Sequence, residues 1–157
     1  VREDLALEPV HPRPIARRYV LRDALSRLEP VATDNHPREF SRTSLGREWR
    51  KLLPGEQSTK YFQLMRPNPL RPCPAITASG GSPGIASVTH PHEPRKFSLP
   101  ELRRICGFPP DFQLSGTFEQ QWERLGRSVP PVMMFHVART LRDEVLLPAG
   151  GREAAPT

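Results

Sequence analysis

Proline content constrains this chain more than any other feature, because 20 of its 157 residues are proline. Inside a helix, proline removes a backbone hydrogen bond and clashes with the preceding turn, so this composition excludes a long helical bundle. Only 36% of the residues are hydrophobic and 7% are aromatic. We therefore expect about one domain of short elements joined by turns and loops. The sequence has neither an apolar run long enough for a transmembrane helix nor a basic-then-apolar leader, so we predict no membrane partner and a cytoplasmic protein.

The chain is basic, with a formal net charge of +6. Its 23 basic residues include only three lysines, and the rest are arginine. A basic surface neutralises phosphates and releases counterions, so one interpretation is a nucleic-acid partner. A codon preference for arginine explains the ratio of arginine to lysine equally well. Charge alone leaves both interpretations open.

The cysteines and histidines do not indicate a metal site. Cys73 and Cys106 lie far apart and belong to no CxxC or Cys/His spacing, so we expect neither structural zinc nor a disulfide framework. Two free cysteines suit a reducing cytosol. His90-Pro91-His92 supplies two histidines, which alone rarely make a metal site, and we interpret this segment as a turn.

Residues 1–48 are predicted to form a connecting, loop-rich segment with one short helix. Apolar residues recur there at helical spacing: Leu21, Ala24, Leu25 and Leu28. This pattern predicts a helix over residues 20–28, ended by Pro30. The polar residues 30–48 are expected to form a loop, and residues 49–53 an extended stretch.

Residues 49–97 predict short strands separated by turns. The expected strands are 61–65, 75–78 and 86–89. The second strand leads into the glycine-rich segment 79–84, where glycines can approach a ligand closely or adopt positive φ.

Two capping boxes predict helices in the next part of the chain. Ser98 and Glu101 have the spacing at which each side chain satisfies a free backbone N–H of a helix start. That helix should run to about residue 106 and end at Gly107. Its inward face is expected to comprise Leu99, Leu102, Ile105 and Cys106. Thr117 and Gln120 predict a second, short helix, which we expect residue 126, a glycine, to end.

A third helix is expected over residues 128–147, with Ser128 as its N-cap. Apolar residues recur on it every four positions: Val129, Met133, Val137, Leu141 and Val145. We expect little within this chain to cover that face, so the helix should pack only partly on the rest of the protein. Residues 148–157 are predicted to be a disordered tail.

Three stretches in fixed order carry a family resemblance. They are Ala75-Ile76-Thr77 with its glycine loop, the run from His90 through Arg95 to Pro109, and the run from Gln120 to Pro131. Together they resemble the C-terminal part of a DNA (cytosine-5) methyltransferase. The first is similar to the end of the family's target-recognition region, and the other two to its ninth and tenth motifs.

The resemblance implies an α+β fold class. Residues 49–97 would be a small target-recognition region of short strands and loops. Residues 98–127 would hold the ninth-motif helix and the short helix after it. The tenth-motif helix, 128–147, would pack on a nucleotide-binding, Rossmann-like α/β domain that these residues do not contain.

The resemblance also implies the site residues. Those expected to face double-stranded DNA are Thr77, Ser79, Gly80, Gly81 and Arg95. A plain hairpin loop is the alternative for the glycine segment, and Arg95 is as well suited to bracing the recognition region as to touching phosphate. The residues expected to line the S-adenosylmethionine pocket are Arg127, Ser128 and Val129. Arg127 replaces the family's asparagine, whose hydrogen bonds a larger, permanently charged side chain does not simply reproduce.

The catalytic residues of the family are not matched here. Its nucleophile lies in a Pro-Cys-Gln segment, whereas Pro72-Cys73 is followed by Pro74. We therefore expect no catalytic residue and no metal site in this chain, and inactivity without a partner that supplies the N-terminal catalytic half. Two alternatives stay open: a non-catalytic DNA-binding subunit or remnant of a split enzyme, and an unrelated basic nucleic-acid binder. The family also implies bacterial restriction-modification and association with the nucleoid.

Overall fold

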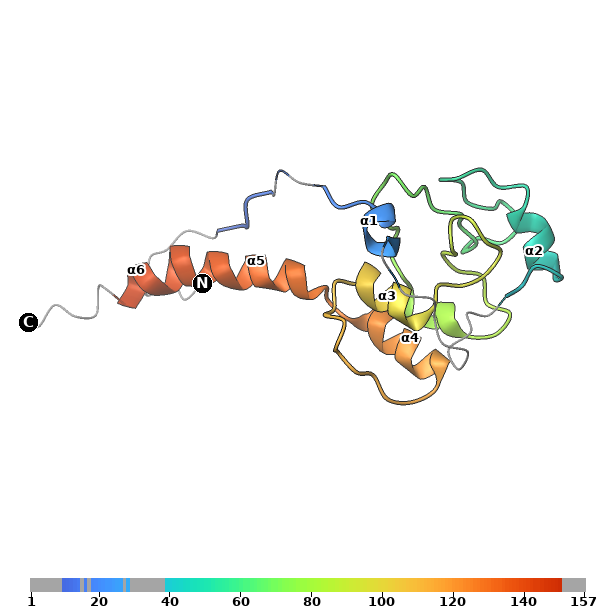
Figure 1. The fold of residues 1–157 in the computed structure, drawn as a ribbon. Coiled ribbons are helices and arrows are strands. Elements are labelled where there is room, and N and C mark those ends of the chain that lie inside the picture. The colour runs from blue at the N-terminus through green and yellow to red at the C-terminus, as the bar shows by residue number, and fades with distance from the viewer. Residues whose placement is uncertain (1–9, 15, 17, 27, 29–38, 151–157) are drawn as a thin grey trace, which may run out of the picture. The chain divides into compact units, whose positions relative to one another are not determined.

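The computed structural model describes residues 10–14, 16, 18–26, 28 and 39–150 (Figure 1). The chain divides into two compact units, and each is described by itself. One unit is Arg18–Ser128, and the other combines Val1–Arg17 with Val129–Thr157. No helix among the described residues is long and apolar enough to cross a membrane.

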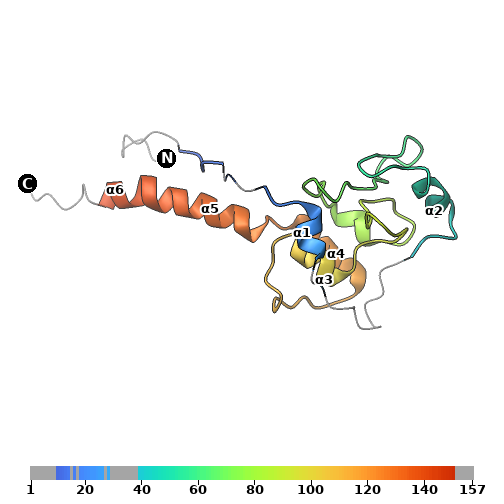
Figure 2. The ribbon, with the colours of Figure 1, turned by 45° about the horizontal axis from the view of Figure 1, so that its top comes forward.

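The first unit contains four α-helices and one 3₁₀ helix in its described residues. They are α1 (Leu21–Leu25), α2 (Ser44–Trp49), η3 (Ala78–Gly81), α3 (Leu99–Ile105) and α4 (Phe118–Arg127). Helix α3 packs against both α1 and α4, and α4 also packs closely on η3. Figures 1 and 2 show these four elements together, with α2 at the other end of the same unit.

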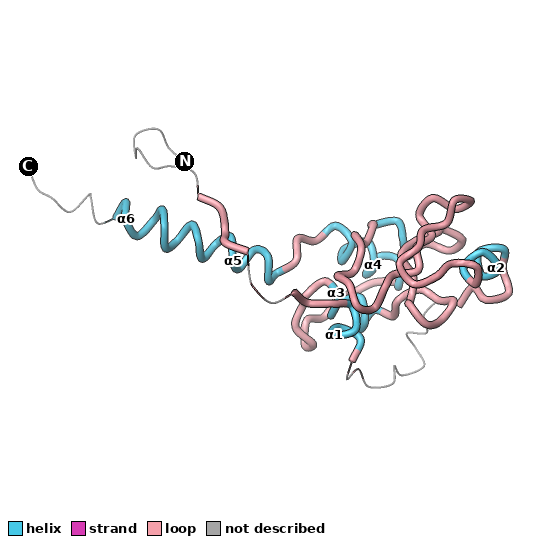
Figure 3. Tube along the Cα trace, turned by 90° about the horizontal axis from the view of Figure 1, so that it is seen from above, coloured by secondary structure: helices cyan, strands magenta, loops and turns pink. Residues whose placement is uncertain are grey.

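Long loops make up much of this unit (Figure 3). Among the described residues, β pairing is limited to isolated bridges, and two of them meet at Met65, which pairs with Gln57 and with Val88. Residues 61–65 and 86–89 therefore touch where strands were expected, without forming a ladder. Ala78 was expected to end a strand, but it begins the 3₁₀ helix η3. The α+β fold class remains a prediction.

The segment before residue 54 departs from two expectations. Residues 44–48 are not loop and Trp49 is not extended, because both belong to α2. Thr43 accounts for this start, since its hydroxyl accepts a hydrogen bond from the backbone N–H of Gly46 and caps the helix. Helix α1 is shorter than expected, because Ser26 already has extended backbone angles. Residues 39–43 of the predicted loop form an isolated bridge from Glu39 to Arg95 and then a turn before α2. Residues 30–38 lie outside the described residues.

Both capping boxes are confirmed. At α3, the Ser98 backbone N–H donates to Glu101 Oε2 over 2.7 Å, and the Glu101 N–H donates to Ser98 Oγ over 3.3 Å. At α4, Thr117 and Gln120 make the same reciprocal pair over 3.0 and 3.3 Å. Gly107 follows α3 with a φ of 78°, which fits its expected role at the helix end.

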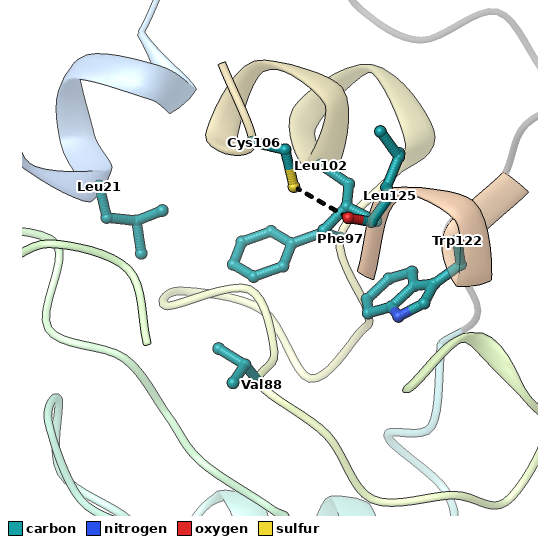
Figure 4. Packing of buried hydrophobic residues seen from close by; sticks show 7 residues of the cluster. All are labelled: Leu21, Val88, Phe97, Leu102, Cys106, Trp122 and Leu125. Atoms are coloured by element: carbon teal, nitrogen blue, oxygen red, sulfur yellow. Dashed lines mark hydrogen bonds between the residues drawn. The ribbon is translucent and has the colours of Figure 1, made fainter. Parts of the chain in front are cut away.

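The core of this unit forms where α1, α3 and α4 meet (Figure 4). Its buried side chains are Leu21, Val88, Phe97, Leu102, Cys106, Trp122 and Leu125. Burying a large apolar side chain contributes about 1.5–3 kcal/mol, so this cluster is the main reason that the short helices hold together. The predicted inward face of α3 is confirmed, with Ile105 packed against the cluster from a partly buried position.

A second cluster lies around α2. It comprises Phe40, Trp49, Leu52 and Leu64. The Trp49 indole N–H donates to Thr89 Oγ1 over 2.8 Å, and that hydroxyl lies 3.0 Å from the Met65 carbonyl oxygen, to which it donates. The Arg66 guanidinium lies 4.2 Å from the centre of the Trp49 ring. These contacts tie α2 to the loops that form the Met65 bridges.

The second unit consists, in its described part, mainly of α5 (Pro131–Leu141), the π-helical η4 (Arg142–Leu146) and α6 (Leu147–Gly150). The predicted cap was wrong: Pro130 is the N-cap of α5, and Ser128 is the C-cap of α4. A proline restricts the residue before it to extended angles, so Pro131 keeps Pro130 out of the helix. Residues 148–150 are helical rather than a tail, and 151–157 lie outside the described residues.

The expected exposure of the apolar face predicted for residues 128–147 is confirmed at three of its five positions. Val129, Met133 and Leu141 are 52%, 58% and 43% exposed, whereas Val137 is half-buried. The expectation was wrong for Val145, which is only 7% exposed.

Candidate DNA-binding and cofactor-binding site

The glycine segment folds directly against the indole of Trp122. A Cβ added at Gly80 would lie 2.8 Å from Trp122 Nε1, and one added at Gly81 would lie 2.6 Å from Trp122 Cβ. Side chains are not tolerated at such distances, so glycine is required here for close approach. The same indole donates a hydrogen bond from Nε1 to the Thr77 carbonyl oxygen over 3.0 Å. Trp122 therefore fixes both the start and the end of η3.

The four residues predicted for this segment fall into two pairs. Thr77 and Ser79 are exposed. Gly80 and Gly81 are buried beneath them against Trp122. The first pair suits contact with a ligand, whereas the second supports the backbone that presents it.

Gly126 has a different role from the one predicted from its position in the sequence. It does not end α4, which continues to Arg127. A Cβ at Gly126 would lie 2.8 Å from both N and Cα of Ala78 and 2.9 Å from the Thr77 carbonyl carbon. The glycine thus allows α4 to touch the backbone of η3, and the predicted DNA-contact residues sit directly on this helix.

Lys96 also holds the backbone of this segment, and sequence analysis missed it. Its residue is only 4% exposed. The ammonium donates hydrogen bonds to the carbonyl oxygens of Gly80, of Ser82 over 2.8 Å and of Ile85 over 3.1 Å. These partners lie 11 to 16 positions away in the chain, so no local pattern could have identified them.

Arg95 makes the contacts of a bracing residue. Its guanidinium donates to both oxygens of Glu101 over 2.8 and 2.9 Å, and its Nε donates to Glu93 over 2.7 Å. The Arg95 side chain is 13% exposed and that of Glu101 is 11% exposed. Because Glu101 also belongs to the capping box, Arg95 ties the loop before α3 to the start of that helix. Its predicted contact with phosphate remains a prediction.

The electrostatics of this cluster follow from its burial. Burial raises the pKa of Glu101, but the hydrogen bonds from Arg95 and from the Ser98 backbone N–H, together with the nearby positive charge, lower it by more, so the carboxyl stays ionised. Burial, with the positive charge of Arg95, lowers the pKa of nearby His90 to about 4. His90 is therefore neutral at pH 7, and its Nδ1 accepts a hydrogen bond from the His92 backbone N–H. Residues 91–94 bend, in agreement with the predicted turn.

Neither cysteine has the properties of a nucleophile. Burial, with a smaller contribution from Cys106, raises the pKa of Cys73 to about 12. Burial also raises the pKa of Cys106 to about 11, and its Sγ lies 4.0 Å from the Leu125 carbonyl oxygen in the core. Reactive cysteines need a lowered pKa, because the thiolate is the nucleophile. Among the described residues, no group of three or more His, Cys, Asp or Glu side chains could hold a metal ion.

The residues predicted for the cofactor lie at the end of α4 and just beyond it. Arg127 is paired with Glu123 on the same helix, over 2.8 Å between Nη2 and Oε1. The Ser128 hydroxyl donates to the Leu125 carbonyl oxygen over 2.7 Å, which leaves the lone pairs of Oγ as acceptors. Val129 presents an exposed apolar side chain. The predicted role of these three residues at the cofactor remains a prediction.

Comparison with known proteins establishes the family. A sequence model of the C-5 cytosine-specific DNA methylases matches residues 26–143, which is most of the chain. The protein therefore belongs to the C-5 cytosine-specific DNA methylase family, and the resemblance found in its sequence is confirmed.

Several type II methyltransferases are similar to the chain. A putative one from Methanocaldococcus jannaschii is 23% identical over 141 residues, covering 85% of this chain and 43% of the relative. M.AquIB of Picosynechococcus sp. is 27% identical over 135 residues, covering 76% of this chain and 94% of the relative. M.DdeI of Desulfomicrobium norvegicum is 35% identical over 77 residues, or 18% of its own length. The chain spans less than half the length of the Methanocaldococcus relative.

Proposed function

We propose that this chain provides DNA target recognition in a cytosine-5 methyltransferase, together with one wall of its S-adenosylmethionine pocket. The observation that carries the proposal is the double support of the glycine segment. Trp122 and Lys96 both hydrogen-bond to its backbone, and Thr77 and Ser79 stay exposed. Exposed hydroxyls on a fixed backbone are suited to contact with phosphate or base edges in a groove.

The chemistry of the whole enzyme assigns this chain a binding role. When bound, S-adenosylmethionine supplies the methyl group that carbon 5 of cytosine receives. The cysteines of this chain hold their protons, so attack on the cytosine ring requires a thiolate from another segment. The cytosine must also leave the duplex to be reached. Thr77 and Ser79 would hold the duplex, while Ser128 and Val129 would contact the cofactor.

A second candidate is a separate subunit of a split methyltransferase that binds DNA without catalysing transfer itself. One observation favours it. The similarity to M.AquIB covers 94% of that relative's length, so a type II methyltransferase chain of about this size is among the similar proteins. In both versions, the nucleophile that attacks the cytosine comes from a segment other than these 157 residues.

Binding of a labelled duplex by the full chain at several salt concentrations tests the proposed role. We expect a dissociation constant of about 10⁻⁴–10⁻⁶ M near physiological salt, and affinity that falls as salt rises. The double variant Thr77→Ala, Ser79→Ala should bind more weakly, whereas Ser115→Ala, at an exposed serine on the loop before α4, should bind like the wild type. A flat salt response, or equal losses in both variants, would contradict the proposal.

A further inference from the structure

The Lys96 ammonium has a complete set of protein acceptors. An ammonium carries three N–H donors and no acceptor. Lys96 directs its donors to the carbonyl oxygens of Gly80, Ser82 and Ile85, which come from one loop. It also lies 5.8 Å from the centre of the Trp122 ring. An ammonium is normally strongly hydrated, but this one lies in the protein interior, where main-chain carbonyl oxygens replace water as its acceptors.

The loop beyond η3 has little else in its own side chains to hold it. Ile85 is 40% exposed, so this large apolar residue is not anchored in the core. Gly84 has a φ of 70°, and a Cβ built there would meet nothing within 4 Å. The carbonyl contacts of Lys96 therefore fix a stretch that packing leaves loose.

We propose that Lys96 is a positioning residue for DNA binding: it turns the carbonyls of Gly80, Ser82 and Ile85 inward and so holds the segment that presents Thr77 and Ser79 in its binding shape. The inference rests on the proposed function, in which Thr77 and Ser79 of this segment contact DNA. Lys96 itself does not touch phosphate, because its ammonium would have to give up three carbonyl partners to reach the surface. Its positive charge acts inside the protein.

The neighbouring Arg95 fixes the backbone of Lys96. Arg95 is held by Glu101 at the start of α3, and its Nη1 also donates to the Lys96 carbonyl oxygen over 3.1 Å. The backbone of Lys96 is thus fixed by α3, while its side chain fixes the loop. The two adjacent basic residues connect a capped helix to the DNA-contact segment.

Acetylation of the wild-type protein gives a first test that needs no variant. The chain has three lysines, Lys51, Lys60 and Lys96, so the exposed two are internal controls. The Lys51 side chain is 72% exposed. We expect acetic anhydride to modify Lys96 much more slowly than the other two, with or without duplex DNA, as read by mass spectrometry. Equal rates at Lys96 and Lys51 would overturn the proposal.

The Lys96→Met variant tests the positioning role, with Lys51→Met as the matched control. Loss of the carbonyl contacts should speed hydrogen exchange in residues 79–85 at least about tenfold, because exchange reports local opening. In Lys96→Met the loop would have to become ordered on binding, so duplex affinity should fall about tenfold. The salt dependence should stay the same, whereas loss of a phosphate contact lowers its slope by about one. Lys51→Met should leave loop exchange unchanged.

The possible outcomes separate the two proposals. A lower salt slope for Lys96→Met, or unchanged loop exchange, overturns the positioning role. If the wild type binds no DNA, the proposed function fails, while loop exchange and acetylation still show whether Lys96 fixes the loop. If Lys96→Met does not fold, Lys96→Arg, which keeps donors, should fold with intermediate loop exchange. Loss of the whole fold in both variants would make Lys96 a general structural residue and overturn the proposal.

Discussion

Replacement of Gly126 by alanine tests the contact between α4 and η3. On an uncrowded helix, alanine is more stable than glycine by about 1 kcal/mol. Here the new Cβ would lie 2.8 Å from two backbone atoms of Ala78, which cannot rotate away as a side chain would. Overpacking costs about 1–3 kcal/mol, and a backbone clash belongs at the upper end. We therefore expect Gly126→Ala to lower the free energy of unfolding by about 2 kcal/mol.

Urea unfolding followed by tryptophan fluorescence measures this effect, because Trp122 lies beside the contact. For slopes of about 1–3 kcal/mol/M, the midpoint should fall by about 1 M. Glu123→Ala, at a side chain of α4 that is 47% exposed, is the matched control and should change stability by less than about 0.5 kcal/mol. Gly126→Ala should also bind DNA more weakly, since η3 must move to make room for the new Cβ. A higher midpoint for Gly126→Ala would refute the close contact.

Three further predictions concern buried ionisable groups. Glu101→Gln should lower the free energy of unfolding by about 3 kcal/mol, because Arg95 loses its buried partner; a urea midpoint within about 0.3 M of wild type (roughly 0.5 kcal/mol) would contradict this. The folded protein binds fewer protons at His90 than the unfolded chain between pH 6.5 and about 4, so stability should fall as pH drops through that range. His90→Gln should flatten this dependence in thermal unfolding measured at several pH values, and an unchanged slope would contradict it. Finally, a thiol reagent at pH 7.5 should modify Cys73 and Cys106 far more slowly in the native than in the urea-unfolded protein, and equal rates would exclude the raised pKa values.

Local sequence rules predicted the helix starts well at Ser98 and Thr117. A capping box involves residues three positions apart, so its geometry follows from the sequence alone. The N-cap preference of serine misled at Ser128, because the two consecutive prolines Pro130 and Pro131 outweigh it. Pro130 must be extended before Pro131. The helix therefore begins at Pro131, two residues after Val129, where an N-cap at Ser128 would have started it.

Contacts over long distances in the chain could not be predicted. The glycines of η3 predicted close approach to a ligand or positive φ, but in the structure Gly80 and Gly81 pack on Trp122. Nothing in the sequence near Lys96 indicates that three distant carbonyls surround its ammonium. The same holds for Gly126, whose partner is the backbone of Ala78. These residues form the support of the candidate site, and only the folded chain brings them together.

Methyl transfer from labelled S-adenosylmethionine to duplex DNA tests the central claim most directly. The full chain is assayed alone and with the N-terminal part of a related cytosine-5 methyltransferase that carries the Pro-Cys-Gln segment. A partner with serine in place of that cysteine is the control. We predict transfer only when this chain and the cysteine-bearing partner are both present. Transfer by this chain alone, above the background of the serine control, would contradict the account, because its two cysteines would then have to include a nucleophile.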